Sequence, residues 1–399
     1  MSNAYLIAAI VFALILGGWA YFRKKEQAQT YGPLVLFHTK KGVGYIDKIA
    51  KLSPTFWRIF GTIGVIAGFF FMIDIAFGIY QSAVHIIKTP TAAAGAALVL
   101  PGLKIMGIKI PVLGWFIGVL SLLVSHELSH GILARAENIK VKTVGAVFLG
   151  FLPIGAFVNP DEKNLLKQTT MKQLRIFAAG SFMNILLSMI LVAIMIFAVL
   201  PVATAHIQGV QLTSIEKNSP AEKAGLEVGM SITEVEGTEI NGLLEFNKFW
   251  TTKGYKAGDT VNFVANGENF EVDLADRGDG FGKAGIVFCG KGVEKMNYPY
   301  GFLAPFVMVG QQQACQQAGA PIWLLYEVLL WAAIINFGVG IVNLLPIKPL
   351  DGGLMLEAVV KKVVKDAVIV RKTVLAVSLV FFFLLLINFI GPHIRNLIT

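Results

Sequence analysis

The chain has 399 residues, of which 55% are hydrophobic and only 15% are charged, and its mean hydropathy is +0.67. This composition excludes an ordinary soluble globular protein and is typical of a protein that crosses the membrane several times. The net charge of +9 would suit a nucleic-acid partner, but the basic residues gather in alternate connections between apolar segments, as in cytoplasmic loops. We therefore expect no nucleic-acid binding.

Windows of about 19 residues pick out the segments that are apolar and long enough to cross a bilayer. The first of them lacks a basic leader and is followed by Arg23, Lys24 and Lys25, so we expect a retained anchor rather than a cleaved signal peptide. The charge pattern places the N-terminus outside and the next connection in the cytoplasm. The fold class is a polytopic α-helical membrane protein of about six transmembrane helices, namely 5–22, 59–80, 110–133, 174–200, 322–345 and 373–390.

The third predicted span contains His126-Glu127-Leu128-Ser129-His130. Histidines four residues apart lie on one face of a helix, so both imidazoles can reach one Zn²⁺ ion while Glu127 stands beside the open coordination position, ready to take a proton from water. Ionisable groups inside a membrane segment are costly and usually functional. The motif therefore predicts a metalloprotease core with His126 and His130 as metal ligands and Glu127 as catalytic base.

Residues 141–160 are apolar but contain Gly145, Gly150, Pro153 and Gly155, so they are too broken to form a full span. Irregular backbone at membrane depth is tolerated where it is buried in protein or lines a watery cavity. The segment is therefore interpreted as a re-entrant or interfacial hairpin of the core, with a plain cytoplasmic loop as the alternative.

Residues 208–276 are of a different character. Polar and apolar residues alternate at 231–235 and 260–265, Asn266-Gly267 indicates a turn, and acidic residues concentrate here. This pattern predicts a soluble α+β module inserted between two spans. The charge rule places the module on the extracytoplasmic side.

The fifth predicted span ends in the sequence Asn343-Leu344-Leu345-Pro346-Ile347-Lys348-Pro349-Leu350-Asp351-Gly352-Gly353. The prolines stop the helix and the glycines allow a tight backbone, so Asp351 is held at a helix break. The charge rule brings this end and the two histidines to the same leaflet. Asp351 is therefore the candidate third ligand, and two imidazoles with one carboxylate leave a tetrahedral zinc ion one open position, as in hydrolytic sites.

Together HELSH, Gly180-Ser181-Phe182-Met183-Asn184 and NLLPIKPLDGG resemble the site-2 protease family of intramembrane zinc metalloproteases over roughly residues 113–357. The resemblance implies that His126, His130 and Asp351 bind one zinc ion per chain and that Glu127 is the base. It also implies hydrolysis of peptide bonds in or near transmembrane segments of membrane proteins, in regulated proteolysis. The insert resembles a PDZ domain, which implies binding of a peptide or protein terminus, through Ser219-Pro220-Ala221, Ala224-Gly225-Leu226 and Val235-Glu236-Gly237.

Three residues differ from the patterns that are common in these families, and the roles of two asparagines have more than one interpretation. Ser181 and Lys348 stand where the proteases commonly have proline, and Met230 stands where such PDZ modules usually have aspartate. None of these is a ligand, so catalysis is not put in doubt. Asn184 and Asn343 are polar residues in apolar spans, and they either join helices by hydrogen bonds or contact the substrate or the transition state.

The sequence thus predicts four regions. Residues 1–109 hold two extra transmembrane helices and a cytoplasmic loop, and 110–202 form the first part of the protease core. Residues 203–297 are the PDZ-like domain, and 298–399 complete the core with the DG motif and a C-terminal helix. The active site would then lie near the cytoplasmic side of the cell membrane.

Two alternatives remain beside an intramembrane protease. One is a membrane metallopeptidase that cuts exposed peptides and takes its third ligand from a glutamate on a following helix, although Asp351 at a helix break speaks against it. The other is a membrane scaffold that binds peptides through the PDZ-like module and keeps a vestigial metal site. The intact set of His126, Glu127, His130 and Asp351 speaks against the scaffold.

Overall fold

The computed structural model of the chain describes residues 28–31, 34–89, 92, 95, 96, 99–105, 108–149, 152–204, 208–278, 280–290 and 322–398. These residues fall into two compact units, one built from 1–188 and 335–399 and the other from 189–334. The predicted first span at 5–22 lies outside the described residues. The predicted boundaries of the four regions stay a prediction.

Among the described residues, five helical segments are long and apolar enough to cross a membrane. They coincide with the predicted spans from the second to the sixth. Along the first of them the exposed side chains recur every three or four residues and are apolar, as at Ile59, Ile63, Ile66 and Phe70, which suits contact with lipid. The segments are α3 (Pro54–Lys88), α4 (Val112–Ala136), α6 (Thr170–Ile194) continued by the π-helix η1 (Met195–Val199) and α7 (Leu200–Thr204), α11 (Ile322–Val342) and α13 (Ala367–Ile398).

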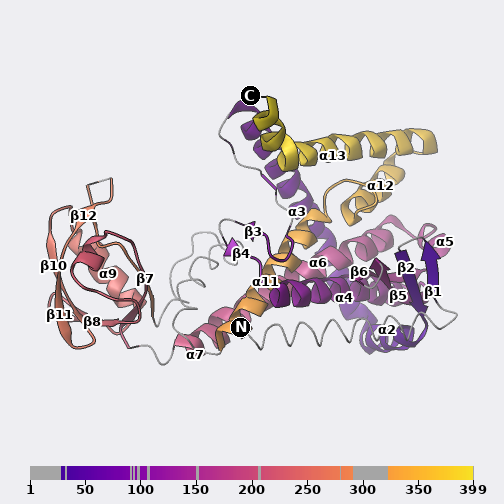
Figure 1. Cartoon of the computed structure of the whole chain (residues 1–399). Helices are drawn as coiled ribbons and strands as arrows, with labels where there is room; N and C mark the ends of the chain where they lie inside the picture. The colour runs from indigo at the N-terminus through magenta and orange to yellow at the C-terminus, as the bar shows by residue number, and fades with distance from the viewer. Residues whose placement is uncertain are drawn as a thin grey trace. The chain divides into compact units, whose positions relative to one another are not determined.

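The first unit contains an antiparallel sheet with the strand order β1-β2-β5-β6 (Figure 1). The predicted hairpin at 141–160 is present as β5 and β6. The sequence did not predict the two strands that extend it from the segment before α3. The strands are β1 (Ala28–Tyr31), β2 (Leu34–Thr39), β5 (Val141–Leu149) and β6 (Leu152–Pro160); a separate short pair is β3 (Lys104–Ile105) with β4 (Ile108–Lys109).

Gly145 shows why the hairpin needs glycine inside a strand. Gly145 lies opposite His38 on one side and Phe157 on the other. A Cβ atom at this position would lie 2.1 Å from the carbonyl oxygen of Phe37 and 2.2 Å from the Phe157 ring. The glycine therefore permits close packing within the sheet, because any side chain there would force the strands or the ring to move.

The helices of the first unit pack around one apolar core, which includes residues of α3, α4, α6 and α12 (Asp351–Val363). Glycines of α3 allow this approach: a Cβ on Gly61 would lie 2.7 Å from Leu133, and one on Gly68 would lie 3.0 Å from Met355. Small residues let membrane helices pack closely. The amphipathic helix α2 (Lys41–Leu52) joins α4 and the sheet through Ile46 and Ala50, and α5 (Glu162–Leu165) follows β6.

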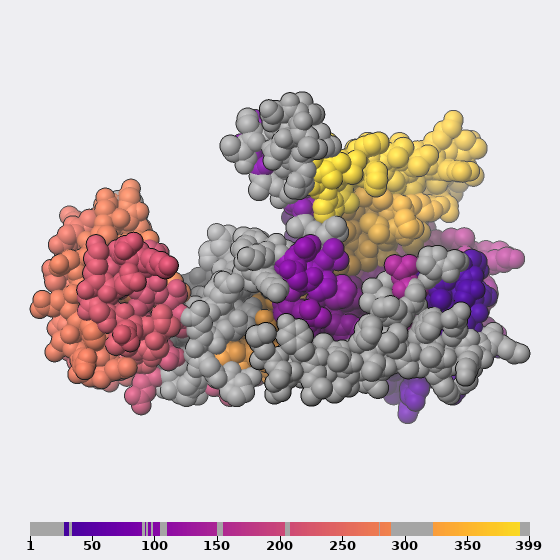
Figure 2. All heavy atoms as spheres, in the orientation of Figure 1, coloured from indigo at the N-terminus to yellow at the C-terminus, as the bar shows by residue number. Residues whose placement is uncertain are grey.

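The second unit contains a further antiparallel sheet with the order β11-β10-β8-β7-β14, and β9 pairs with β8. The strands and helices between Val210 and Gly290 form a compact body (Figures 1 and 2) with fully buried residues such as Phe263 and Leu212. The predicted strands at 231–235 and 260–265 are β8 and β10. The predicted turn joins β10 to β11 with positive φ at Asn266 (50°) and Gly267 (85°), as two-residue hairpins require.

The bounds of these elements are β7 (Val210–Ile215), α8 (Pro220–Lys223), β8 (Ser231–Val235), β9 (Thr238–Glu239), α9 (Leu243–Lys253), β10 (Thr260–Ala265), β11 (Glu268–Asp273), β12 (Ala275–Asp276), β13 (Gly282–Lys283) and β14 (Ile286–Gly290). The module is thus of the predicted α+β type. It runs past residue 276, because β14 pairs with β7.

An ion network around the buried Glu137 side chain joins the ends of α3, α4 and α6. The Glu137 side chain, which is 2% exposed, receives Arg175 Nη1 at 2.7 Å, and Arg58 Nε lies 3.9 Å from its other oxygen. Arg175 Nε also donates to Thr62 Oγ1 at 2.9 Å, and Arg58 Nη2 donates to the Ala136 carbonyl at 2.9 Å. The three helix ends are therefore connected through charged side chains that each have a hydrogen-bond or ion-pair partner.

We expect Glu137→Ala to destabilise the first unit by about 1–3 kcal/mol, because it leaves the half-buried Arg175 guanidinium without its carboxylate. Thermal and denaturant unfolding in detergent measure the loss. The control is Glu162→Ala, which removes an exposed carboxylate and should change stability by no more than about 0.5 kcal/mol. Equal effects of the two substitutions would contradict the assigned role of Glu137.

Candidate metal centre

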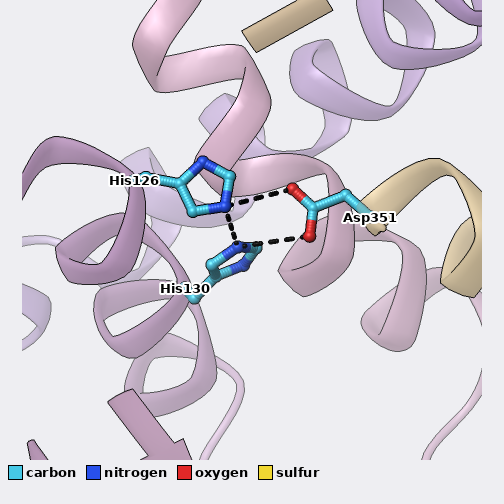
Figure 3. A group of neighbouring side chains, drawn as sticks. All are labelled: His126, His130 and Asp351. Carbon is cyan, nitrogen blue, oxygen red and sulfur yellow. Dashed lines mark hydrogen bonds and ion pairs between the residues drawn. The ribbon is translucent and has the colours of Figure 1, made fainter. Parts of the chain in front are cut away.

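α4 brings the two predicted histidine ligands together on successive turns. The Nε2 atoms of His126 and His130 lie 3.1 Å apart, and the rings are nearly perpendicular (Figure 3). Both side chains are half-buried. The four-residue spacing therefore produces the geometry that the motif predicted, with two nitrogen lone pairs directed at one point.

Asp351 reaches the same point from the start of α12. Its Oδ2 lies 3.5 Å from His126 Nε2, and its Oδ1 lies 3.4 Å from His130 Nε2 (Figure 3). The glycines that follow are needed for this turn: a Cβ on Gly352 would lie 2.0 Å from the Leu344 carbonyl oxygen, and one on Gly353 would lie 2.5 Å from Ile347. The chain can therefore fold back tightly enough to present the carboxylate.

The three donors fit a zinc ion. At zinc–ligand distances of about 2.0–2.2 Å, two corners of a tetrahedron lie about 3.3–3.6 Å apart. The two histidine nitrogens lie 3.1 Å apart, and each of them lies 3.4–3.5 Å from a different oxygen of the Asp351 carboxylate. With one ligand atom from each residue, the three atoms lie within 4.8 Å of one another. Two imidazoles and one carboxylate also leave the fourth corner for a reactant, which distinguishes a hydrolytic site from a structural one.

α6 supports each of the three side chains from one face. His130 Nδ1 lies 2.7 Å from the Ile176 carbonyl oxygen, which can only accept, so the ring donates there and Nε2 keeps its lone pair. Ser181 Oγ donates to Asp351 Oδ2 at 2.9 Å. Such partners fix the orientation of ligands before a metal binds. In the sequence, Ser181 is recognisable only as a departure from a family pattern, and its bond to Asp351 was not predicted.

Asn184 is fully buried and contacts His126 rather than the open side of the site. One end of its amide lies 3.1 Å from His126 Nδ1 and the other lies 2.7 Å from Ser125 Oγ, which also lies 3.2 Å from the Leu122 carbonyl oxygen. Ligation through Nε2 requires a proton on Nδ1. In the structure the amide nitrogen faces Nδ1 and the amide oxygen accepts from Ser125 Oγ. Turning the amide over places its oxygen toward Nδ1, where it accepts that proton, and its amino group toward Ser125.

Gly180 allows α6 to lie directly against the two rings. A Cβ on Gly180 would lie 2.4 Å from His130 Nε2 and 2.7 Å from His126 Nδ1. No real Cβ atom occupies such a position, so any other residue would displace the helix or the ligands. The signal for this role was a glycine inside a predicted span, which the sequence analysis quoted but did not assign.

Glu127 lies beside the ligands and is held by the sheet. Its Oε2 accepts a hydrogen bond from the backbone N–H of Val158 in β6 at 2.8 Å. Asn343 lies one turn before the tight fold, and its carbonyl oxygen accepts from the Gly352 N–H at 2.8 Å. Within the described part of the chain the half-buried Asn343 amide has no hydrogen-bond partner.

We expect Asn184→Ala to lower zinc affinity by about 10- to 100-fold, because His126 loses the group that holds its ring and its Nδ1 proton. Competition with a chromogenic chelator on the detergent-solubilised chain measures the affinity. Asn388→Ala is the matched control, since Asn388 is also buried in a span and donates to the Ile79 and Leu384 carbonyls. An unchanged affinity in Asn184→Ala, or an equal loss in both variants, would refute the role of Asn184.

Comparison with known proteins places the chain in a family. The model of Peptidase family M50 matches residues 114–387, which is more than half of the chain. This range contains His126, Glu127, His130 and Asp351.

The relatives point the same way. "Uncharacterized protein MJ0971" of Methanocaldococcus jannaschii is 28% identical over 363 residues, covering 88% of this chain and 84% of that protein. "Putative zinc metalloprotease CPE1693" of Clostridium perfringens is 24% identical over 341 residues, covering 70% and 96%. "Membrane metalloprotease ARASP, chloroplastic" of Arabidopsis thaliana is 26% identical over 311 residues, covering 60% and 69%. The chain therefore belongs to peptidase family M50, the site-2 proteases, as its motifs predicted, and so to the multi-pass membrane zinc metalloproteases.

Proposed function

We propose that the chain hydrolyses peptide bonds in or near the transmembrane segments of membrane proteins, in regulated proteolysis. In this proposal His126, His130 and Asp351 hold the zinc ion and Glu127 is the catalytic base. The observation that carries the proposal is the meeting of the three ligand atoms within 4.8 Å of one another beside a helix that is apolar enough to cross a membrane. A site for exposed peptides would not need to be built into such a helix.

A zinc ion held by His126, His130 and Asp351 would supply Lewis acidity to activate a water molecule and polarise the peptide carbonyl. Glu127 takes the proton of the attacking water and passes it to the leaving amine. Its hydrogen bond from Val158 occupies Oε2, so Oε1 carries the proton. His126 and His130 keep fixed rings through Asn184 and Ile176 and do not transfer protons themselves.

Asn343 is the proposed donor to the oxygen on which negative charge develops. Its side chain is half-buried, and within the described residues it makes no hydrogen bond that would have to break. A donor aimed at developing charge in a dry site stabilises the transition state. Asn184 does not share this role in the proposal, because it is buried against His126 and Ser125.

The site is proposed to open toward the cytoplasmic leaflet. His130 precedes Arg135 at the end of α4 by five residues, which corresponds to about 7 Å of helix. Arg58 and Arg175 also lie at the ends of apolar helices, and Lys361 and Lys362 lie at the end of α12; basic residues favour the cytoplasmic side. A substrate helix must unwind to expose its carbonyls there, so we expect helix-breaking residues such as Gly or Pro in good substrates.

The inserted module is proposed to be a PDZ-like domain of residues 203–297 on the extracytoplasmic side. Its antiparallel sheet with one short and one longer helix supports this assignment. Such a module can bind an extended terminus by adding it to a sheet edge. In this proposal it selects which membrane proteins reach the protease.

We expect Glu127→Gln to lower cleavage by about 10²–10⁴-fold, because the amide cannot accept the proton of the attacking water. The assay uses detergent-solubilised chain and a model transmembrane segment that contains paired glycines. Zinc content by atomic emission should stay at one ion per chain, since Glu127 is not a ligand.

Two outcomes would separate the alternatives. Cleavage of a soluble peptide but of no transmembrane segment would favour a metallopeptidase of exposed peptides. Zinc binding with no cleavage of either would favour a scaffold. Cleavage activity in the Glu127→Gln chain would contradict the assignment of Glu127 as the catalytic base.

Replacing residues 208–290 by a flexible linker should change which substrates are cut while leaving zinc content unaltered. The reason is that all proposed ligands lie in the first unit and the module lies in the second. Cleavage rates for a panel of substrates with different exposed termini measure the effect. Identical rate ratios before and after the replacement would speak against a selecting role.

A further inference from the structure

A cavity of about 340 Å³ lies between the four-stranded sheet, α2 and α4. These elements contact one another within the first unit (Figure 1). Protein interiors contain few voids larger than a water molecule, whereas pockets that bind ligands start at about 300 Å³. The size therefore indicates a binding site rather than a packing defect.

The cavity exists because two residues of the sheet that face it have small side chains. Phe37, Ala146 and Ala156 lie side by side across β2, β5 and β6, and all three line the cavity. Alternate residues of a strand point to the same face, so the two alanines leave space where larger side chains would fill it. Val144 and Val158, two residues along, also line the cavity, and they pack against the cluster formed by α2 and α4 at that end.

The lining of the cavity fixes the chemistry of its occupant. Phe37 and Phe148 form one wall with their rings at 5.3 Å and nearly perpendicular, and Val124 and Leu128 of α4 form another. Almost all of this surface is apolar. Of the lining residues only His38, Thr39 and Glu127 have polar side chains, so a charged or strongly polar occupant would lose hydration and gain few partners. The cavity therefore suits a large hydrophobic group.

The cavity adjoins the proposed catalytic base. Glu127 is itself one of the lining residues, and it follows Val124 by one turn of α4. A group seated in the cavity would therefore belong to a chain whose backbone passes Glu127. The occupant that satisfies both conditions is a side chain of the substrate beside the bond that is cut.

We propose that this cavity is a specificity pocket for a leucine- or phenylalanine-sized side chain next to the scissile bond. The inference rests on the proposed function, because its occupant is the substrate. Phe37 and Ile46, which help to line the pocket, precede residue 114, where the match to family M50 begins. Selectivity at this position is thus supplied in part by the segment 34–52, which the family match does not cover.

The test compares pairs of transmembrane substrates. The two members of a pair differ in a single residue, which is leucine in one and alanine in the other. One pair varies the residue before the cleaved bond, and a second pair varies the residue after it. The native chain should cut the leucine form about 10- to 200-fold faster in kcat/KM, as expected for a hydrophobic pocket that gains several methyl or methylene groups. Ala146→Leu fills the pocket, so the ratio should fall toward one. Leu36→Phe is the control, because Leu36 lies on β2 opposite Val147 and does not line the cavity; its ratio should equal that of the native chain.

A second measurement covers the case that Ala146→Leu does not fold. A substrate with a benzophenone side chain at the same residue is irradiated with the Glu127→Gln chain, and the crosslinked residues are mapped by mass spectrometry. Crosslinks to Val124, Leu128 or Ala156 support the pocket, and crosslinks only elsewhere overturn it.

The outcomes distinguish this inference from the proposed function. Glu127-dependent cleavage with a ratio near one in the native chain overturns the pocket alone, and it points to a lipid chain as occupant. If the folded Ala146→Leu chain still cuts the leucine substrate faster than the alanine substrate by the native ratio, the pocket is likewise overturned while the proposed function stands. Failure to cleave any transmembrane segment overturns the proposed function and the pocket together.

Discussion

The metal centre depends on the contact of α6 with the two histidine rings at Gly180, where a Cβ would lie only 2.4 Å from His130 Nε2. Ile176, Gly180 and Asn184 are spaced by four residues, so they form one stripe along the helix. This stripe supplies the acceptor for His130, the space for both rings and the partner of His126. Ser181, beside it, holds Asp351. One helix therefore positions three ligands that come from two other elements.

Polar groups in an apolar surrounding are stabilising only when their hydrogen bonds are complete. Asn184, Ser181 and Asp351 are all buried, yet each of them has a partner within the site. An unpaired amide or carboxylate there would cost several kcal/mol. The ligands are therefore held in place by groups that would otherwise destabilise the core, and this couples the site to the packing of α4 against α6.

The sequence predicted the features that depend on a pattern within a short stretch of chain, namely the candidate metal ligands. Spacing on one helix produced His126 and His130, and the break at Pro349 to Gly353 produced Asp351, because each signal lies within a dozen residues. Asn184 was singled out, with hydrogen bonding between helices as one of its two possible roles, but the contacts of the supporting groups with the ligands were not predicted, since they act across 46, 58 and 170 residues of chain. The Ile176 acceptor is a backbone carbonyl, which has no signature in sequence. β1 and β2 were missed for a related reason: they are short, and what makes them strands is their pairing in the order β1-β2-β5-β6, which links them to a segment about 100 residues away.

In the proposed function, α4 carries both the catalytic groups and one wall of the proposed substrate pocket. His126 and His130 occupy one of its faces, and Val124 and Leu128 occupy another that looks toward the sheet. Glu127 lies between these faces and is tied to β6 by the Val158 N–H. A change in the packing of β2 or α2 would therefore move β6 and, through Val158, the carboxylate itself. Residues outside the family match can in this way alter both the pocket and the aim of the base without touching a metal ligand.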